Sequence, residues 1–351
     1  MIVSTFEYTD HGWHLGEVSF GSQNLIVGKN AVGKSKTLHA LVLVAKFIKG
    51  DMRGYIPAHS CRIVFTLEEG RRLEFAYSYE NNVVLSEFLR DGEMILVDRN
   101  KDAVVVRDEP ANPPVNRLCV QSQRDTSKNP EFEYVISWAE QMRGFSFSDL
   151  SSSKSYDIPN MFDEKLDFVE LFEHIGDERK DFNIQMMHAM GYDIDNIEPF
   201  MFSDKYKMIT LYEQGVSIPL FVSSVSNGML RVFYIFTYLS YVATEEGAKT
   251  LLIDDLGEGL DFSRSKKLSK LIFGYCAEHN IQLIATTNDN FLMNAVSLSH
   301  WVILLRNKQN IKAFSEHTHP EMFAKFKRTG LNNFDMLGTD FVYNYLKESG
   351  K

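Results

Sequence analysis

The sequence is poor in cysteine and has no long hydrophobic run. Only Cys61, Cys119 and Cys276 occur among 351 residues, and this odd number at unrelated spacings favours a reducing cytoplasm over a disulfide framework or a zinc site. The most apolar run, residues 232–243, is too short to cross a bilayer, and the N-terminus has no signal-peptide pattern. We therefore expect a cytoplasmic protein that has no membrane partner.

The chain also lacks an excess of positive charge. It has 37 Lys and Arg residues against 47 Asp and Glu residues, a formal net charge of −10 and a pI near 5.5. This balance argues against a surface that coats nucleic acid, although a local basic groove stays compatible with it. No sustained heptad repeat occurs, which excludes a long coiled coil. The length and the 44% hydrophobic content predict a large core, in two lobes or in one domain with an insertion.

What the sequence does contain is a phosphate-binding loop. Residues 25–27 read as the end of a buried strand, residues 28–35 have the pattern G-x-x-x-x-G-K-S, and a helical pattern follows. Gly28 and Gly33 let backbone N–H groups turn inward, and the helix N-terminus adds its positive dipole end. We expect Lys34 to contact the β- and γ-phosphates and Ser35 to bind Mg²⁺. The predicted nucleotide-binding residues of this loop are Gly28, Lys29, Asn30, Ala31, Val32, Gly33, Lys34, Ser35, Lys36 and Thr37.

Short strands surround this loop. Residues 2–8 and 13–20 predict a hairpin, and residues 62–107 predict an antiparallel meander with turns at Gly and Asn positions. Residues 117–120 predict one more strand. The aromatic residues of the hairpin are either core residues or candidates for stacking on an adenine ring; they are Phe6, Tyr8 and Trp13.

Residues 131–200 read as helical and irregular. Residues 163–182 contain eight acidic and three basic residues, and apolar residues recur among them at helical spacing. We expect an amphipathic helix here whose acidic face is either a solvated surface or a docking site for a basic partner.

The second half of the chain carries polar residues at the ends of apolar elements. Ser226-Asn227-Gly228 precedes a helix and offers another anion-binding helix start. The apolar strand 249–253 ends in Asp254 and Asp255, an arrangement that holds Mg²⁺ through water and polarises an attacking water. The loop 257–261 opens the next helix. A last core strand then ends in the polar run 286–290.

In this order, the motifs resemble the heads of ABC-type ATPases. The chain is similar to the stand-alone prokaryotic ATPases grouped with the SMC and OLD (overcoming lysogenization defect) families, often filed as AAA-15 or AAA-21 proteins. The resemblance covers residues 2–305 and implies an α/β P-loop NTPase with a parallel core sheet, an added antiparallel β-meander and a helical lid insertion. It places an N-terminal ATPase lobe at 1–130, the helical insertion at 131–200 and a C-terminal ATPase lobe at 201–351.

The resemblance also implies a catalytic set of Lys34, Asp255 and Asn288. Asp255 stands where the family has its catalytic Glu and is one methylene shorter, so hydrolysis is expected to be slow or to need tighter closure, with Glu258 as a less favoured base. Asn288 stands where the family usually has a switch His, and its amide can still hydrogen-bond phosphate.

Further residues would hold the metal and complete a dimer. Mg²⁺ would be held by Ser35, Asp254 and Gln121, with Gln123 in reserve for Gln121. The signature residues Ser226 and Gly228 would touch the γ-phosphate held by a second protomer, and Asp261 would line the dimer seam.

The function implied by the resemblance is an ATP-hydrolysing switch. Its cofactors would be ATP and Mg²⁺, its active form a nucleotide-sandwich homodimer, and its output the control of a separate nuclease or toxin in antiphage defence or genome maintenance. Two alternatives stay open: a DNA-binding SMC-like repair ATPase, which requires a basic groove, and the nucleotide-binding subunit of an ABC transporter. The tail after residue 305 is too short for a nuclease domain, and its aromatic residues either cover the head or dock a partner.

Overall fold

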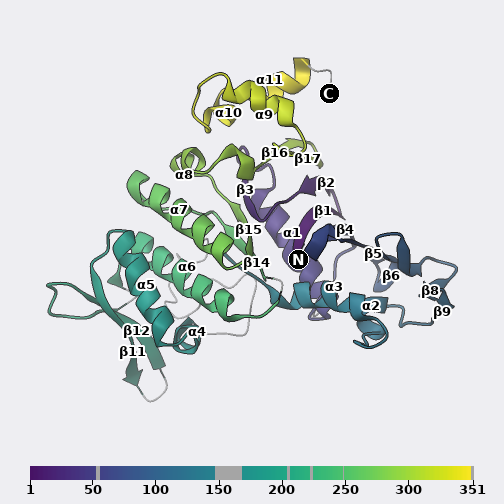
Figure 1. Cartoon of the computed structure of the whole chain (residues 1–351), viewed down its shortest axis with the longest axis horizontal. Helices are drawn as coiled ribbons and strands as arrows, with labels where there is room; N and C mark the ends of the chain where they lie inside the picture. The colour runs from purple at the N-terminus through teal and green to yellow at the C-terminus, as the bar shows by residue number, and fades with distance from the viewer. Residues whose placement is uncertain (53–55, 147–167, 204–205, 222–223, 248, 349–351) are drawn as a thin grey trace. The chain divides into compact units, whose positions relative to one another are not determined.

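The computed structural model describes residues 1–52, 56–146, 168–203, 206–221, 224–247 and 249–348 (Figure 1). The chain forms two compact units. The first consists of Met1–Met142, Gly247–Thr250 and Ser297–Lys351, and the second of Arg143–Glu246 and Leu251–Val296. This division differs from the boundaries expected at 130 and 200, because the last strands of the chain return to the N-terminal sheet.

The first unit is built on a mixed sheet. Among its described residues, the strands follow the order β3-β16-β17-β2-β1-β4-β5-β6-β7-β8-β9. They are β1 (Ile2–Asp10), β2 (Trp13–Ser19), β3 (Gln23–Val27), β4 (His59–Thr66), β5 (Arg72–Glu80), β6 (Val83–Asp91), β7 (Met94–Arg99), β8 (Val104–Val106), β9 (Glu109–Pro110), β16 (Trp301–Asn307) and β17 (Asn310–Ser315). β16 is parallel to β3 and β17 is parallel to β2. From β2 through β1 and β4 to β9, neighbours are antiparallel, which confirms the hairpin and the meander.

The helices of the first unit cover one face of this sheet and form the tail. They are α1 (Lys34–Lys49), α2 (Cys119–Ser122), α3 (Pro130–Gln141), α9 (Pro320–Lys327), α10 (Asp335–Gly338) and α11 (Phe341–Glu348). Phe47 of α1 stacks on Tyr77 of β5, with ring centroids 4.9 Å apart. Trp138 of α3 meets Phe65 of β4 edge to face at 5.3 Å. In the tail, Met322, Phe323, Phe326, Met336 and Val342 are buried, so these side chains close a core.

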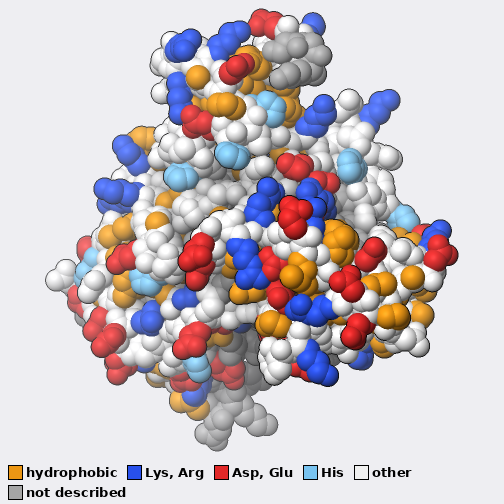
Figure 2. Space-filling model, turned by 45° about the vertical axis from the view of Figure 1, so that its right-hand side comes forward, with side chains coloured by type: hydrophobic (Ala, Val, Ile, Leu, Met, Phe, Trp, Pro, Cys, Tyr) orange, Lys and Arg blue, Asp and Glu red, His pale blue; other side chains and the backbone are white. Residues whose placement is uncertain are grey.

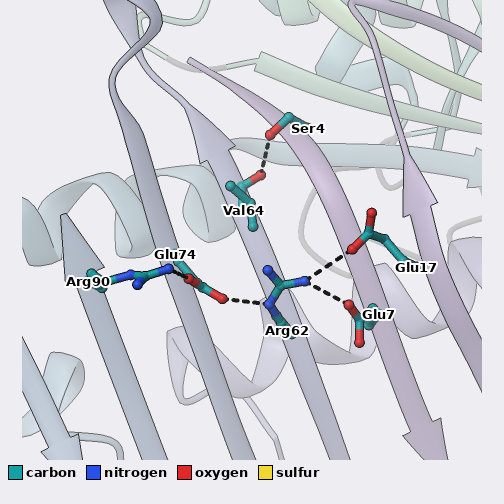
Figure 3. Close-up of polar contacts among 7 residues, drawn as sticks. All are labelled: Ser4, Glu7, Glu17, Arg62, Val64, Glu74 and Arg90. Carbon is teal, nitrogen blue, oxygen red and sulfur yellow. Dashed lines mark hydrogen bonds and ion pairs between the residues drawn. The ribbon is translucent and has the colours of Figure 1, made fainter. Parts of the chain in front are cut away.

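The opposite face of the meander carries a row of ion pairs (Figure 3). Arg62 of β4 donates to Glu7 of β1 at 2.7 Å, to Glu17 of β2 at 3.3 Å and to Glu74 of β5 at 2.6 Å. Arg90 of β6 pairs with the same Glu74. Exposed ion pairs contribute little each, but cross-strand pairs of opposite charge favour one register. This row therefore helps to fix the alignment of five neighbouring strands.

The second unit combines helices with two groups of strands. In one group the order is β10 (Met142–Ser146), β14 (Lys249–Asp254) and β15 (Ile281–Thr286), and in the other it is β11 (Ile194–Ser203), β12 (Tyr206–Glu213) and β13 (Leu220–Phe221). The helices are α4 (Phe168–His174), α5 (Asp177–Ala189), α6 (Asn227–Thr244), α7 (Phe262–Glu278) and α8 (Asn290–Ala295). All six residues of β15 are buried. The apolar runs read as core strands therefore occupy the core.

Two expectations about the middle of the chain are corrected. Residues 117–120 do not form a strand, because the chain turns at Leu118 into the short helix α2. Residues 131–200, expected to be helical and irregular, also contain the strands β10 and β11. The expected acidic helix lies in part outside the described residues, and its remainder is divided between α4 and α5 at Gly176, whose φ of 75° ends the helical path. Among the described residues, no helix is long and apolar enough to cross a membrane.

Candidate functional site

The loop between β3 and α1 is closed by its own lysine. Lys34 is 6% exposed, and its Nζ donates to the carbonyl oxygens of Gly28 at 2.9 Å and Lys29 at 3.2 Å. A β-carbon at Gly28 would lie 2.8 Å from the carbonyl oxygen of Leu304 and 2.9 Å from Cγ2 of Val32. No larger residue fits at Gly28 without a shift, which explains the first glycine of the motif.

The first turn of α1 presents backbone N–H groups and a hydroxyl. Gly33 is the N-cap, with no side-chain cap and no acidic residue in the first turn. Ser35 is half-buried, and none of the described residues forms a hydrogen bond with its hydroxyl. Thr37 Oγ1 donates back to the Gly33 carbonyl at 2.9 Å. An uncapped helix N-terminus attracts anions, and a hydroxyl oxygen suits a hard cation.

The aromatic residues of the hairpin support this loop from within the core. Phe6, Tyr8 and Trp13 are at most 4% exposed, so the core interpretation holds for them. A β-carbon at Gly33 would lie 3.2 Å from the Trp13 ring, and the Lys36 ammonium sits 4.6 Å from that ring while pairing with Asp10 at 3.0 Å. In this conformation the predicted nucleotide-binding residue Lys36 is engaged through its side chain by the hairpin.

Two contacts of the loop could not be predicted from the motif. Arg306, at the end of β16, donates from Nη1 to the Ala31 carbonyl at 3.0 Å. Lys29 pairs with Asp340, just before α11, at 2.5 Å. The only signal for Arg306 is its place at the end of a strand that pairs with β3; nothing in the sequence relates Asp340 to the loop.

Gln121 is not at the phosphate end of α1, and its assignment as a Mg²⁺ ligand is wrong. Its Nε2 donates to the carbonyls of Phe47 and Ile48 at 2.6 and 2.9 Å, and its Oε1 accepts from Leu118 N at 3.0 Å. These carbonyls belong to the last turn of α1, about 18–20 Å along the helix axis from Ser35 at about 1.5 Å per residue. The Gln121 side chain therefore caps the C-terminal end of α1 and lies too far from Ser35 to bind the same metal ion. A strand at 117–120 would place the amide of Gln121 at a strand end, whereas the helix α2 places it against the end of α1.

In the second unit, the end of β14 places two carboxylates beside Thr286. Asp254 is 5% exposed, and its Oδ1 accepts from Thr286 Oγ1 at 2.6 Å. The same hydroxyl accepts from the Asp255 backbone N–H at 2.9 Å. Asp255 has a left-handed φ of 54°, which a non-glycine residue rarely adopts and which often marks a functional position. No motif singles out Thr286, the last residue of β15, although it opens the polar run 286–290.

A second layer of contacts orients Asp255. Asn288 donates from Nδ2 to Asp255 Oδ1 at 2.9 Å. Asp289 accepts from Ser265 Oγ of α7 at 2.6 Å and caps α8 through Phe291 N at 2.7 Å. The loop after β15 thus joins the carboxylate to the starts of α7 and α8. Asp255 and Asn288, predicted as catalytic partners from separate segments, are in direct contact.

The segments expected to act at a dimer seam touch each other within the second unit. Ser226 caps α6 by accepting from Met229 N at 3.2 Å. A β-carbon at Gly228 would lie 3.2 Å from the carbonyl oxygen of Gly259, so the start of α6 packs directly on the loop after Asp255. The absence of a side chain at Gly228 permits this approach.

The same loop is held by two arginines. Arg231 of α6 donates to the Glu258 carboxylate at 3.0 Å, which engages the residue considered as a substitute base. Asp261 caps α7 by accepting from Arg264 N at 3.0 Å and from Arg264 Nη1 at 2.8 Å. The Arg264 backbone N–H, together with its guanidinium, holds the pKa of Asp261 below its usual value.

About half of the chain matches the model of a known protein family. Residues 124–294 match a family model described as "AAA domain, putative AbiEii toxin, Type IV TA system". The matched segment contains the Asp254 cluster and Ser226 but not the phosphate loop. No curated protein matches the chain.

Solved SMC head domains have a similar fold. A head bound to the C-winged helix domain of ScpA is 12% identical with a TM-score of 0.58, and the match covers 92% of this chain and 100% of that one. A second, a head with an extended coiled coil bound to the C-terminal domain of ScpA from Pyrococcus furiosus, is 10% identical with a TM-score of 0.53, and covers 93% and 99%. The chain therefore has the fold of these SMC heads, and its residues 124–294 resemble the AAA family. Both findings agree with the resemblance drawn from its motifs, including the P-loop α/β fold.

The donors of the phosphate loop fit a magnesium nucleotide. Among the described residues, no group of three or more His, Cys, Asp or Glu side chains converges on a metal position, so a dedicated all-protein metal cage is lacking there. Ser35 instead offers a single oxygen ligand, as in sites where Mg²⁺ keeps waters and phosphate oxygens. Gly28 leaves the cradle free of side-chain atoms, and Lys34 supplies the counter-charge.

Proposed function

We propose that the chain binds ATP with Mg²⁺ and hydrolyses it as a switch. The observation that carries the proposal is the state of the phosphate loop, where a buried ammonium rests on two carbonyl oxygens beside an uncapped helix N-terminus. A buried charge is costly unless it is compensated, and phosphate oxygens are stronger partners for an ammonium than carbonyls are. Lys34 is therefore arranged to exchange its carbonyl partners for an anion.

The predicted site residues would have separate tasks in binding and hydrolysing ATP. When bound, Mg²⁺ neutralises phosphate charge and ATP supplies the phosphoanhydride bond. Ser35 and Asp254 would hold the metal, with Thr286 fixing the Asp254 carboxylate. Asp255 would accept the proton of the attacking water, and Asn288 would hold the Asp255 carboxylate in place for this. Gln121 is left out of this set.

A nucleotide-sandwich homodimer is the form in which we propose that the switch works. Ser226 and Gly228 would complete the site of a second protomer, and Asp261 would line the seam. The contact of Gly228 with the loop after Asp255 supports this, because movement at one site would reach the residues offered to the other. ATP can shift the equilibrium between the open and the closed dimer only by as much as its affinities for the two states differ.

We further propose that the switch controls a separate effector, a nuclease or toxin, in antiphage defence or genome maintenance. Two findings support a partner protein. The matching family description names a type IV toxin–antitoxin system, and both SMC heads were solved bound to ScpA. In this chain the buried tail aromatics, Phe323 and Phe326, serve its own core.

Calorimetry with Lys34→Ala tests the nucleotide site. We expect the wild-type chain to bind Mg²⁺-ATP and the variant to lose measurable binding, because a charge-assisted contact is removed. Lys49→Ala is the matched control: Lys49 lies at the other end of α1 and pairs with Asp51, so binding should be unchanged. Equal affinity of Lys34→Ala and wild type would refute the assignment of the loop.

A further inference from the structure

Helix α7 carries an exposed stripe of lysines that the nucleotide chemistry does not use. Lys266, Lys267 and Lys270 are all exposed, and they lie on one side of the helix at i, i+1 and i+4. Between Phe262 and Ala277 the helix has no acidic residue. In a chain with a net charge of −10, this part of α7 is therefore a local region of positive charge.

The three lysines are unpaired among the described residues. No ion pair or hydrogen bond there involves their ammonium groups. Other lysines of the chain are paired with carboxylates, namely Lys29, Lys36, Lys49, Lys180, Lys207, Lys325 and Lys327. On the face drawn in Figure 2, basic and acidic side chains are interspersed in the same way. The α7 stripe groups three unpaired, exposed lysines on one side of one helix, and their charge is available to an external anion.

Two exposed aromatic rings lie at the start of the same stripe. Phe262, the first residue of α7, is 56% exposed, and Phe291 of α8 is 41% exposed. Their rings meet edge to face with centroids 5.2 Å apart. Phe262 and Lys266 are four residues apart and therefore share one side of the helix, about 5–6 Å from each other. Large apolar side chains are normally buried, so an exposed pair beside unpaired cations indicates a binding surface.

We propose that this surface, formed by Lys266, Lys267, Lys270, Phe262 and Phe291, binds single-stranded nucleic acid. The lysines would contact successive backbone phosphates, and the aromatic pair would stack on an unpaired base. Basic side chains combined with exposed aromatic rings are the combination that single-strand binders use. A duplex hides the faces of its bases, so the aromatic pair is of use only with an unpaired strand. This proposal goes beyond the nucleotide chemistry and does not depend on it.

The surface is linked to the carboxylate cluster by one short path. Ser265 of α7 donates to Asp289 at 2.6 Å, and Asp289 caps the helix that begins with Asn290 and carries Phe291. Asn288, the next residue back, holds Asp255. A nucleic-acid strand bound to Phe291 and α7 would therefore contact both α7 and α8, the two helices that Asp289 joins.

Fluorescence anisotropy with a labelled oligothymidine at low salt tests the proposal. The triple variant Lys266→Gln, Lys267→Gln, Lys270→Gln should bind at least about tenfold more weakly, with the slope of log K against log salt reduced by about 2, since each single-strand phosphate contact contributes about 0.7. The triple variant Lys101→Gln, Lys128→Gln, Lys347→Gln removes the same charge from exposed positions in the first unit. It is expected to bind like wild type.

A second variant separates stacking from charge. Phe262→Ala should lower the affinity for oligothymidine on the order of tenfold without changing the salt slope, and it should leave the weaker binding of a duplex unaltered. Equal binding by the two lysine variants, or no binding by the wild-type chain, would overturn the proposal. Stronger binding of polyglutamate than of oligothymidine would also overturn it and would indicate an acidic protein partner instead.

Discussion

Asn288 holds the carboxylate of Asp255: its Nδ2 donates to Oδ1 at 2.9 Å. The two residues come from the ends of neighbouring strands, and Asp255 adopts a left-handed φ of 54° that directs its side chain away from the usual path of a strand end. The amide thus occupies the position expected for the family's switch His and contacts the residue expected to be the base. We interpret this pair as the unit that positions the proton acceptor.

Substitution of Asn288 tests that interpretation. Asn288→Ala should lower kcat at least about tenfold, while the KM for ATP stays within about twofold, because a positioning contact to the base is lost and the phosphate loop is intact. Asn288→Asp should move the acidic limb of the kcat profile to higher pH, because a second carboxylate raises the pKa of the first. A steady-state profile measured for both variants checks this. An equal loss in kcat with an unshifted profile for Asn288→Asp would argue against the pair.

Gln121→Ala distinguishes a structural amide from a metal ligand. Removing the amide leaves the Phe47 and Ile48 carbonyls without this donor, which should lower the free energy of unfolding by about 1–3 kcal/mol. The dependence of turnover on Mg²⁺ should not change. Urea unfolding and a magnesium titration of ATPase activity provide the two readouts. A raised magnesium requirement with unchanged stability would restore the metal assignment.

The pair formed by Lys29 and Asp340 predicts an effect of the tail on the nucleotide. Both side chains are more than half exposed, so the pair is worth no more than about 1 kcal/mol. Asp340→Asn frees the Lys29 ammonium for phosphate and should tighten ATP binding about two- to fivefold at low salt, with a smaller gain at high salt. The matched control is Glu348→Gln, which breaks the tail's own pair with Lys325 and should leave affinity unchanged. Equal affinities for wild type and Asp340→Asn would rule out the coupling.

The cap of α7 predicts a pH dependence of stability. Because the pKa of Asp261 is lowered in the folded chain, its contribution is fully present above the unfolded value of about 4 and is lost as the pH falls through the folded value. Asp261→Ala should cost about 1 kcal/mol at neutral pH, and this difference from wild type should shrink below about pH 4. Asp261→Asn keeps a good capping group and should cost less at neutral pH. Thermal unfolding across this range supplies the measurement, and a difference that grows on acidification would contradict the assignment.

Local patterns in the sequence were sufficient for much of the fold. The loop at Gly28, the hairpin and the meander follow from glycine positions, turn residues and strand alternation, which act over a few residues. The apolar strand before Asp254 was recognised for the same reason. That Asp255 and Asn288 meet could be expected from the family alone, since two strand ends are adjacent only after the sheet has formed.

What the sequence did not reveal depends on contacts between distant segments. The role of Gln121 cannot be predicted from a motif, because its partners are backbone carbonyls at the end of α1, which any sequence would supply. The sequence does not predict β11, because it lies in a stretch with a helical pattern and is stabilised by pairing with β12. The contact of Asp340 with Lys29 spans most of the chain and joins two exposed side chains, so neither burial nor periodicity indicates it.

We expect ATP to assemble two copies of this chain around the nucleotide. Asp255→Asn is suited to the test, because Asn tolerates the left-handed backbone of this position and cannot accept the proton of the attacking water. Light scattering coupled to size exclusion should show the variant at the 40.3 kDa of one chain without nucleotide and at twice this mass with Mg²⁺-ATP. The same variant with Ser226→Arg added should stay at the lower mass. An unchanged mass of Asp255→Asn in Mg²⁺-ATP, at a concentration where calorimetry shows the nucleotide bound, would show that ATP does not assemble the dimer.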